Sequence, residues 1–99
     1  MSLVKRNREI SHVWLDILCR VDKRHTLGTA VLYLAPRPDA GAIKVGNGLH
    51  WDDHGKAVGD CPECAVTGKG KDQRISRARI EARLNELLDA GQDSGKLQA

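Results

Sequence analysis

The chain of 99 residues has the length of one small domain, and its net charge of +3 is too low to hold it on nucleic acid by charge alone. Two tryptophans, one tyrosine and no phenylalanine leave a small, mostly aliphatic core. No stretch approaches the ~20 apolar residues of a membrane span, and the basic start lacks the pattern of a signal peptide. We therefore expect a cytoplasmic protein without membrane contact, whose small core needs a further stabilising element such as a structural metal.

The first informative segment, residues 13–18, has an ambiguous apolar pattern. From Ile10 to Val21 the apolar residues recur with the spacing of a helix face, but read with period two they also alternate as in a strand. A metal-binding role for Cys19 would favour the strand, because zinc-binding turns usually lie at strand ends. We predict a strand over 13–18, with a helical lead-in.

Three further strands are predicted before residue 52. Residues 26–34 are rich in Thr, Val, Leu and Tyr, which suits a strand. The prolines and glycine of residues 36–41 indicate a loop. Short strands are then expected over 42–45 and 49–51, joined at Asn47-Gly48, which is the strongest short signal for a hairpin turn.

The motif Cys61-Pro62-Glu63-Cys64 is typical of a zinc knuckle. Two residues between the cysteines let both thiolates point at one ion from a tight turn, while backbone N–H groups bond the sulfurs. Cys19 is the third and last cysteine of the chain. A closed tetrahedral site therefore needs a fourth ligand of another kind.

Several residues could supply that fourth ligand. His25 lies six positions after Cys19, immediately before the predicted strand over 26–34, and Asp22 lies three positions after it. A neutral imidazole completes a set of three thiolates far better than a carboxylate does. We predict one structural Zn²⁺ held by Cys19, His25, Cys61 and Cys64, with Asp22, then His50 or His54, as alternatives for the fourth position.

The run from Leu18 to Gly28, followed by strands and then by Cys61 to Cys64, resembles a zinc ribbon. The resemblance covers Cys19 to Ala65, about half of the chain, and implies antiparallel strands whose two ligand-bearing turns close on one ion. The chain departs from that pattern at two positions. Asp22 stands where the first turn usually has its second cysteine, and Ala65 replaces the usual glycine.

Two reactive alternatives receive less support. A redox-active C-x-x-C motif needs a helix N-terminus to lower a thiol pKa, and the residues after Cys64 do not predict a helix. His50 and His54, with the two aspartates between them, could form the metal centre of a nuclease. The neighbouring glycines predict a turn instead, which would not place both histidines on one face. A closed, thiolate-rich site has no open position for substrate, so we expect no enzyme activity and no small-molecule substrate.

A basic run follows the second pair of cysteines. Residues 66–79 contain five basic residues and one acidic residue, and positive charge at a helix start opposes the helix dipole. A nearby phosphate backbone would explain this charge, although an ordinary solvated helix with pairs such as Arg77–Glu81 is the simpler interpretation. The candidate nucleic-acid contacts are Lys69, Lys71, Arg74, Arg77 and Arg79.

The last predicted element is an amphipathic helix over residues 74–90. Ile80, Leu84, Leu87 and Leu88 recur with helical spacing, and Gly91 is a suitable residue to end the helix. An exposed leucine stripe on this helix would mark a protein partner or a dimer seam.

We thus expect a small mixed α+β fold, with three or four antiparallel strands of zinc-ribbon type followed by one C-terminal helix. The chain is expected to divide into a flexible basic N-terminus (1–9), a zinc-stabilised domain (10–90, comprising a ribbon over 10–66, a flexible basic linker over 67–73 and a helix over 74–90) and a flexible tail (91–99).

The predicted function is that of a binding module. The first hypothesis is a regulator, of phage or bacterial origin, that contacts nucleic acid or the transcription machinery through the basic linker and the helix. The alternative is a protein–protein interaction adaptor, phage-encoded and aimed at a host protein. A metal-dependent nuclease is the third hypothesis and has the least support.

Overall fold

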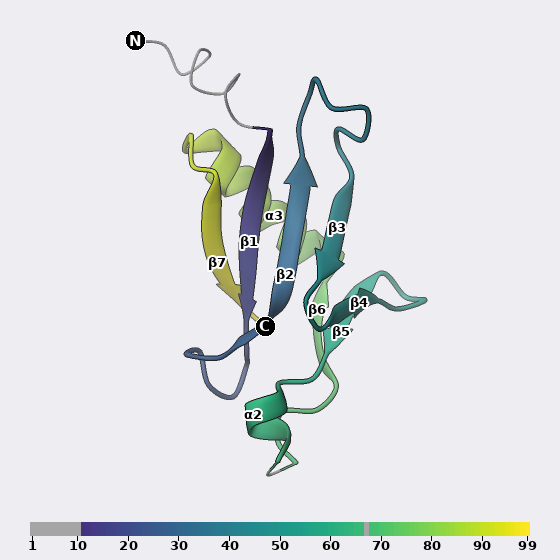
Figure 1. The fold of residues 1–99 in the computed structure, drawn as a ribbon, viewed down its shortest axis with the longest axis vertical. Coiled ribbons are helices and arrows are strands. Elements are labelled where there is room, and N and C mark those ends of the chain that lie inside the picture. The colour runs from purple at the N-terminus through teal and green to yellow at the C-terminus, as the bar shows by residue number, and fades with distance from the viewer. Residues whose placement is uncertain (1–10, 67) are drawn as a thin grey trace.

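The computed structural model describes residues 11–66 and 68–99, and these form two β-sheets, a short helix and a longer helix (Figure 1). The first sheet has four strands in the order β3-β2-β1-β7, and the second has three in the order β4-β5-β6. The expected basic N-terminus and helical lead-in lie in the segment before residue 11, outside the described residues. The elements are β1 (His12–Leu18), β2 (Thr26–Tyr33), β3 (Ile43–Gly46), β4 (Leu49–Trp51), β5 (Lys56–Gly59), α2 (Pro62–Ala65), β6 (Gln73–Ser76), α3 (Arg77–Asp89) and β7 (Ser94–Gln98).

The mixed α+β class is therefore confirmed, with more strands than expected. In β1 the strand period is the one observed: Val13, Leu15 and Ile17 are fully buried, while the residues between them are partly exposed. α3 lies behind this sheet in Figure 1 and covers the face on which the buried residues lie. The core therefore forms between the helix and one face of the four-stranded sheet.

The Asn47-Gly48 turn is present, but its two strands do not pair with each other. β3 pairs with β2, whereas β4 pairs with β5, so the expected hairpin over 42–51 is wrong. Both turn residues have positive φ, 54° at Asn47 and 108° at Gly48, and the chain here passes from one sheet to the other. The close approach of Leu49 to Gly28 leaves no room for a Cβ at that glycine, since the Leu49 Cγ would lie 2.5 Å from it. The two sheets thus meet near the end of β1 and the start of β2.

The C-terminal helix is shorter than the predicted 74–90. Residues 74–76 belong to β6, where Gln73 and Ile75 are buried and pair with β5, so the alternation of a strand overrides the helical spacing of Ile75. Ser76 caps α3 by accepting a hydrogen bond from the Arg79 N–H at 3.2 Å. The predicted end at Gly91 is confirmed, because Gly91 has a φ of 71° and its N–H donates to the Leu88 carbonyl.

The expected flexible tail is also corrected. Residues 94–98 form β7, which pairs in parallel with β1 and becomes an edge of the four-stranded sheet. Two arginines of α3 reach this strand: Arg79 donates to the Gln98 carbonyl at 3.0 Å and Arg83 to the Lys96 carbonyl at 3.0 Å. These bonds satisfy polar backbone groups of an edge strand, which is otherwise a site of unwanted pairing.

The apolar side chains of α3 pack into the core of the fold. Ile80 and Leu84 are fully buried, Leu87 is 1% exposed, and Leu88 packs against the same core. Burial of these side chains removes the exposed surface on which the expected dimer seam depended. None of the helices in the described parts of the chain has the length and apolar character needed to cross a membrane.

Candidate metal centre

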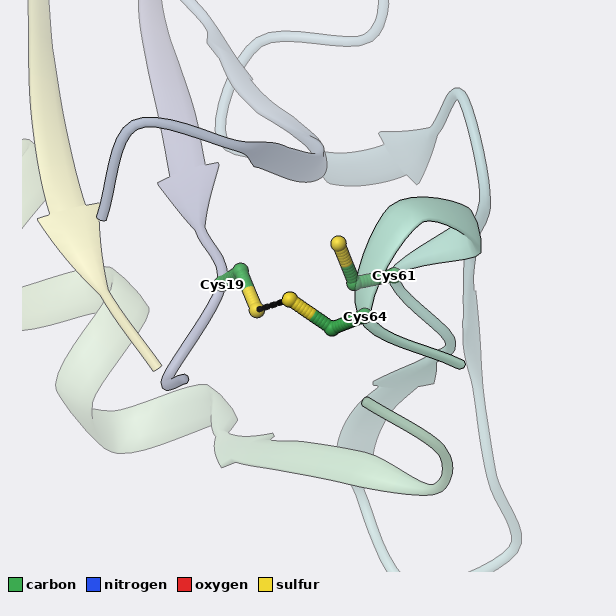
Figure 2. A group of neighbouring side chains, drawn as sticks. All are labelled: Cys19, Cys61 and Cys64. Atoms are coloured by element: carbon green, nitrogen blue, oxygen red, sulfur yellow. Dashed lines mark hydrogen bonds between the residues drawn. The ribbon is translucent and has the colours of Figure 1, made fainter. Parts of the chain in front are cut away.

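Three cysteines meet between the end of β1 and the short helix α2 (Figure 2). Cys19 directly follows β1, while Cys61 and Cys64 flank the first turn of α2, and all three side chains are buried. Their sulfur atoms lie within 4.8 Å of one another, and the Cys19 and Cys64 sulfurs are 3.8 Å apart. Residues 42 to 45 positions apart in the sequence thus form one sulfur cluster.

His25 lies beside this cluster on the loop between β1 and β2. Backbone bonds close the loop, with the Cys19 N–H donating to the His25 carbonyl at 2.9 Å and the His25 N–H donating to the Asp22 carbonyl at 3.0 Å. The His25 Nδ1 is 3.6 Å from the Cys61 sulfur and 3.4 Å from the Cys64 sulfur. The loop therefore places an imidazole nitrogen against two of the three thiols.

These separations match the edges of a zinc tetrahedron. Zn–S bonds of about 2.3 Å and Zn–N bonds of about 2.0–2.1 Å require about 3.8 Å between two sulfurs and about 3.5 Å between sulfur and nitrogen. The distances of 3.8 Å for Cys19–Cys64, and of 3.6 and 3.4 Å from His25 to Cys61 and Cys64, lie close to those values. Three of the six edges are thus close to those of a zinc tetrahedron, and the donor atoms are of the kinds that zinc prefers.

The cluster is also electrostatically suited to a cation. Burial raises the pKa of Cys19, but hydrogen bonds from the Gln73 amide and the following loop outweigh this and lower the pKa to about 7. Burial, together with the neighbouring Cys19 and Cys61 sulfurs, raises the pKa of Cys64 to about 12. The Cys19 thiol therefore loses its proton readily, whereas the neighbouring sulfurs disfavour ionisation of Cys64. A bound divalent cation would stabilise both thiolates and so favour ionisation of Cys64.

Gln73 is a supporting residue that sequence reasoning placed in the flexible linker. Its side chain is fully buried and makes three hydrogen bonds. The amide Nε2 donates to the Cys19 sulfur at 3.1 Å and to the Gly70 carbonyl at 3.1 Å, and Oε1 accepts from the Arg20 N–H at 2.6 Å. Gln73 thus joins β6 to both ligand-bearing loops. Its alternation with Ile75 was the one sequence signal of burial.

Two carboxylates face the outer nitrogen of the imidazole. The His25 Nε2 lies 3.3 Å from a Glu63 oxygen and 3.7 Å from an Asp22 oxygen. Hydrogen bonds from Arg24 hold the pKa of Asp22 well below its usual range, so this carboxylate stays charged. Such partners orient a metal-binding histidine and raise its basicity. The Asp22 carboxylate therefore lies beside His25 and belongs to neither group of potential ligand atoms formed by the described residues.

The other candidate ligands lie elsewhere. Neither His50 nor His54 belongs to a cluster of potential ligand atoms formed by the described residues. Asp52 instead organises their loop, accepting hydrogen bonds from the backbone N–H groups of His54 and Lys56, both at 2.8 Å. The predicted turn is thus confirmed, and among the described residues neither histidine belongs to a group of three or more potential metal ligands.

The five basic candidates divide into two groups. Arg77 forms the predicted pair with Glu81 at 2.7 Å and lies over the Trp51 ring, and Arg79 is bound to the carbonyl of Gln98. The other three are exposed and form none of the ion pairs found among the described residues. These three, which we call the knuckle cations, are Lys69, Lys71 and Arg74.

The segment predicted as a flexible linker, which carries two of these cations, is hydrogen-bonded to the residues around the cysteine cluster. The Gly70 carbonyl accepts from the Cys61 N–H at 2.9 Å, and the Asp72 N–H donates to a carboxylate oxygen of Asp60 at 2.7 Å. Gly70 itself is buried. Lys69 and Lys71 are therefore presented from a turn anchored on the cysteines.

No protein-family model, curated protein or solved structure matches this chain.

Proposed function

We propose that the chain binds one structural Zn²⁺ through Cys19, His25, Cys61 and Cys64. The observation that carries this proposal is the agreement of one sulfur–sulfur distance and two sulfur–nitrogen distances with the edges of a zinc tetrahedron. The hydrogen bond from Gln73 to Cys19 and the carboxylates beside His25 supply the outer contacts that such sites use.

The arrangement supports a zinc-ribbon type of clamp. One ligand pair comes from the loop between β1 and β2, and the other from the turn between β5 and β6, so the ion would fasten one sheet to the other. Four protein ligands leave no position for water or substrate. We therefore assign the ion a structural role and the protein a binding function rather than an enzymatic one.

Metal stoichiometry tests this site. The parent is expected to contain one zinc per chain, and both Cys19→Ser and His25→Ala to lose or greatly weaken it. Asp22→Ala, which removes only an outer contact, serves as the matched control and should retain the ion. Full zinc content in His25→Ala, or loss of zinc in Asp22→Ala alone, would contradict the proposed ligand set.

For the partner, we propose nucleic acid, contacted first through the knuckle cations. Lys69, Lys71 and Arg74 are exposed on the segment that follows the second cysteine pair, and none of them forms an ion pair with another described residue. Hydrogen bonds at Gly70 and Asp72 hold the backbone of this turn, so little backbone entropy would be lost when the turn meets phosphates. Arg77 and Arg79 are already engaged within the fold and are left out of this surface.

Salt dependence of binding tests this partner. Affinity for a labelled oligonucleotide should fall steeply with salt, and the triple variant Lys69→Ala, Lys71→Ala, Arg74→Ala should lower the logarithmic slope by about two to three. Lys23→Ala, on the opposite ligand loop, removes one positive charge away from these cations and should leave the slope nearly unchanged. Binding without salt dependence, or none at any salt concentration, would contradict nucleic acid as the partner and would favour a protein partner.

A further inference from the structure

The face of the four-stranded sheet that points away from α3 carries aromatic rings on its two central strands. His12 and Trp14 alternate with the buried residues of β1, and Tyr33 of β2 lies directly opposite His12 in the register. Cross-strand partners project from the same face of a sheet. These three side chains therefore share one face, which we call the ring face.

The rings are held at this face and are separate from the core. Trp14 and Tyr33 are each half-buried and lie outside the core cluster that packs against α3. The Trp14 indole donates to a carboxylate oxygen of Asp16 at 2.9 Å, which fixes its orientation. Within the described residues, no element crosses this face in Figure 1.

Positive charge lies on both sides of the rings. Lys44 of β3 is the cross-strand neighbour of Val31, which itself lies opposite Trp14, and on the other edge Lys96 of β7 lies beside Asp16. Both lysines are exposed. The two edge strands therefore place cations on either side of a central aromatic strip.

Two of the basic groups also contact the tyrosine directly. The Arg37 guanidinium lies 4.2 Å and the Lys44 ammonium 5.4 Å from the centre of the Tyr33 ring. Asp39 pairs with Arg37, and Asp16 is engaged by the indole, so each nearby acidic group already has a partner. The cation over the ring can also form a stacking surface of its own.

We propose that the ring face binds single-stranded nucleic acid, with bases stacked on Trp14 and on the Tyr33 ring together with the Arg37 guanidinium above it, and phosphates directed towards Lys44 and Lys96. The proposal deepens the proposed function, on which it rests for the class of ligand, and it assigns the strand state. Rings on a sheet can stack only on bases that are not already enclosed in a duplex.

The chemistry of the face favours this ligand over a protein. Only Val21 and Val66 are strongly exposed among the larger apolar residues described, and neither belongs to the ring face. Val31, at its centre, is 9% exposed. A protein interface would need a broader apolar area, whereas a single strand needs separated rings with cations alongside.

The test compares labelled single-stranded DNA and RNA oligonucleotides of one sequence with the corresponding hairpin duplex, using the zinc-loaded full chain. Single strands should bind more tightly than the duplex. The double variant Trp14→Leu, Tyr33→Leu, which keeps apolar bulk on the sheet, should weaken single-strand binding about tenfold or more and duplex binding little. Zinc content and the unfolding midpoint verify that the variant is folded.

A second measurement does not depend on the folding of that variant. Trp51→Phe leaves Trp14 as the sole tryptophan, and its fluorescence should be quenched when the single strand is added. Trp14→Phe, in which Trp51 remains, is the control and should show little quenching.

The outcomes separate the two proposals. Equal binding of duplex and single strand, or an unchanged affinity in the double variant, overturns the ring face while leaving the knuckle cations in place. Loss of all nucleic-acid binding in the parent overturns both. An isolated protein complex that Trp14→Leu, Tyr33→Leu disrupts would replace nucleic acid by a protein as the ligand of this face.

Discussion

At the scale of single residues, Gln73 joins β6 to both loops that carry the candidate metal ligands. Its amide touches the Cys19 sulfur, the Gly70 carbonyl and the Arg20 N–H, all within a fully buried position. A buried amide of this kind lowers the stability of the fold little while all its hydrogen bonds are made. Loss of one partner destabilises the fold, because a buried polar atom without a hydrogen bond keeps its full desolvation penalty.

Substitution of Gln73 by leucine should therefore weaken both folding and metal binding. The Arg20 N–H, the Gly70 carbonyl and the Cys19 sulfur would each lose a partner, at about 1–3 kcal/mol for each buried polar group left unsatisfied. Denaturant unfolding of the zinc-loaded protein and a competition titration with a chromophoric chelator measure the two effects.

The exposed Gln92→Leu provides the control, since that side chain forms none of the hydrogen bonds found in the described residues. Equal zinc affinities for the two leucine variants would show that Gln73 only packs beside the site.

At the scale of elements, the turn between α2 and β6 depends on a glycine that packs beneath the cysteines. A Cβ at Gly70 would lie 2.6 Å from the Cys64 Cβ and 2.9 Å from the Ala65 backbone nitrogen, so it would collide mainly with main-chain and first-carbon atoms that cannot rotate away. The same residue accepts hydrogen bonds from Cys61 and Gln73 through its carbonyl.

Gly70→Ala should therefore displace the ion-binding turn and lower zinc affinity at least tenfold, with a loss of about 1–3 kcal/mol in unfolding free energy. Gly46→Ala is the matched control, because the nearest atom to a Cβ there is the Thr29 hydroxyl oxygen at 4.0 Å. Zinc titrations of both variants decide the matter. An alanine at residue 70 that binds zinc like the parent would refute this role of the turn.

The elements that sequence reasoning identified are those whose pattern is local. The strand over 26–34 was predicted because its β-branched and aromatic residues favour it, whereas the ambiguous pattern over 13–18 was assigned to a strand because Cys19 follows it. β6 was missed, since Ile75 fits the helical stripe as well as a strand and its buried neighbour, Gln73, is polar. β7 was missed because residues 94–98 contain one large apolar side chain. Its stability comes instead from pairing with β1, 80 residues away in register.

In the candidate site, too, the residues with a local sequence signal were predicted and those that depend on tertiary contacts were not. Spacing and chemistry were sufficient to select three cysteines and His25, and the structure brings these groups together. Gln73 could not be selected, because its role depends on the meeting of two loops with a strand that the sequence did not predict. The ring face was also missed, since it needs the register of β1 against β2 and the knowledge of which face α3 covers.

At the scale of the whole molecule, the candidate metal centre lies where the two sheets meet. Cys19 and His25 extend from the four-stranded sheet, and Cys61 and Cys64 extend from the three-stranded one. A continuous core also joins the sheets, because Leu49, Ala57 and Ile75 belong to the same cluster as the residues beneath α3. Zinc is therefore expected to add to an existing interface rather than to create it.

Removal of zinc should consequently loosen the smaller sheet before the larger one. Structural zinc sites contribute on the order of 10 kcal/mol of apparent folding free energy, and the three-stranded sheet has no long helix of its own. With a chelator, hydrogen exchange should accelerate first in β4, β5, β6 and the ion-binding turn, while the centres of β1 and β2 stay protected longer. The melting temperature should fall strongly and recover when zinc is restored.

In Cys19→Ser, which lacks the site, the chelator should have no further effect on the melting temperature. Uniform acceleration across both sheets would instead mean that the ion supports the entire fold as one cooperative unit, and equal melting curves for the parent and Cys19→Ser would rule out a structural ion.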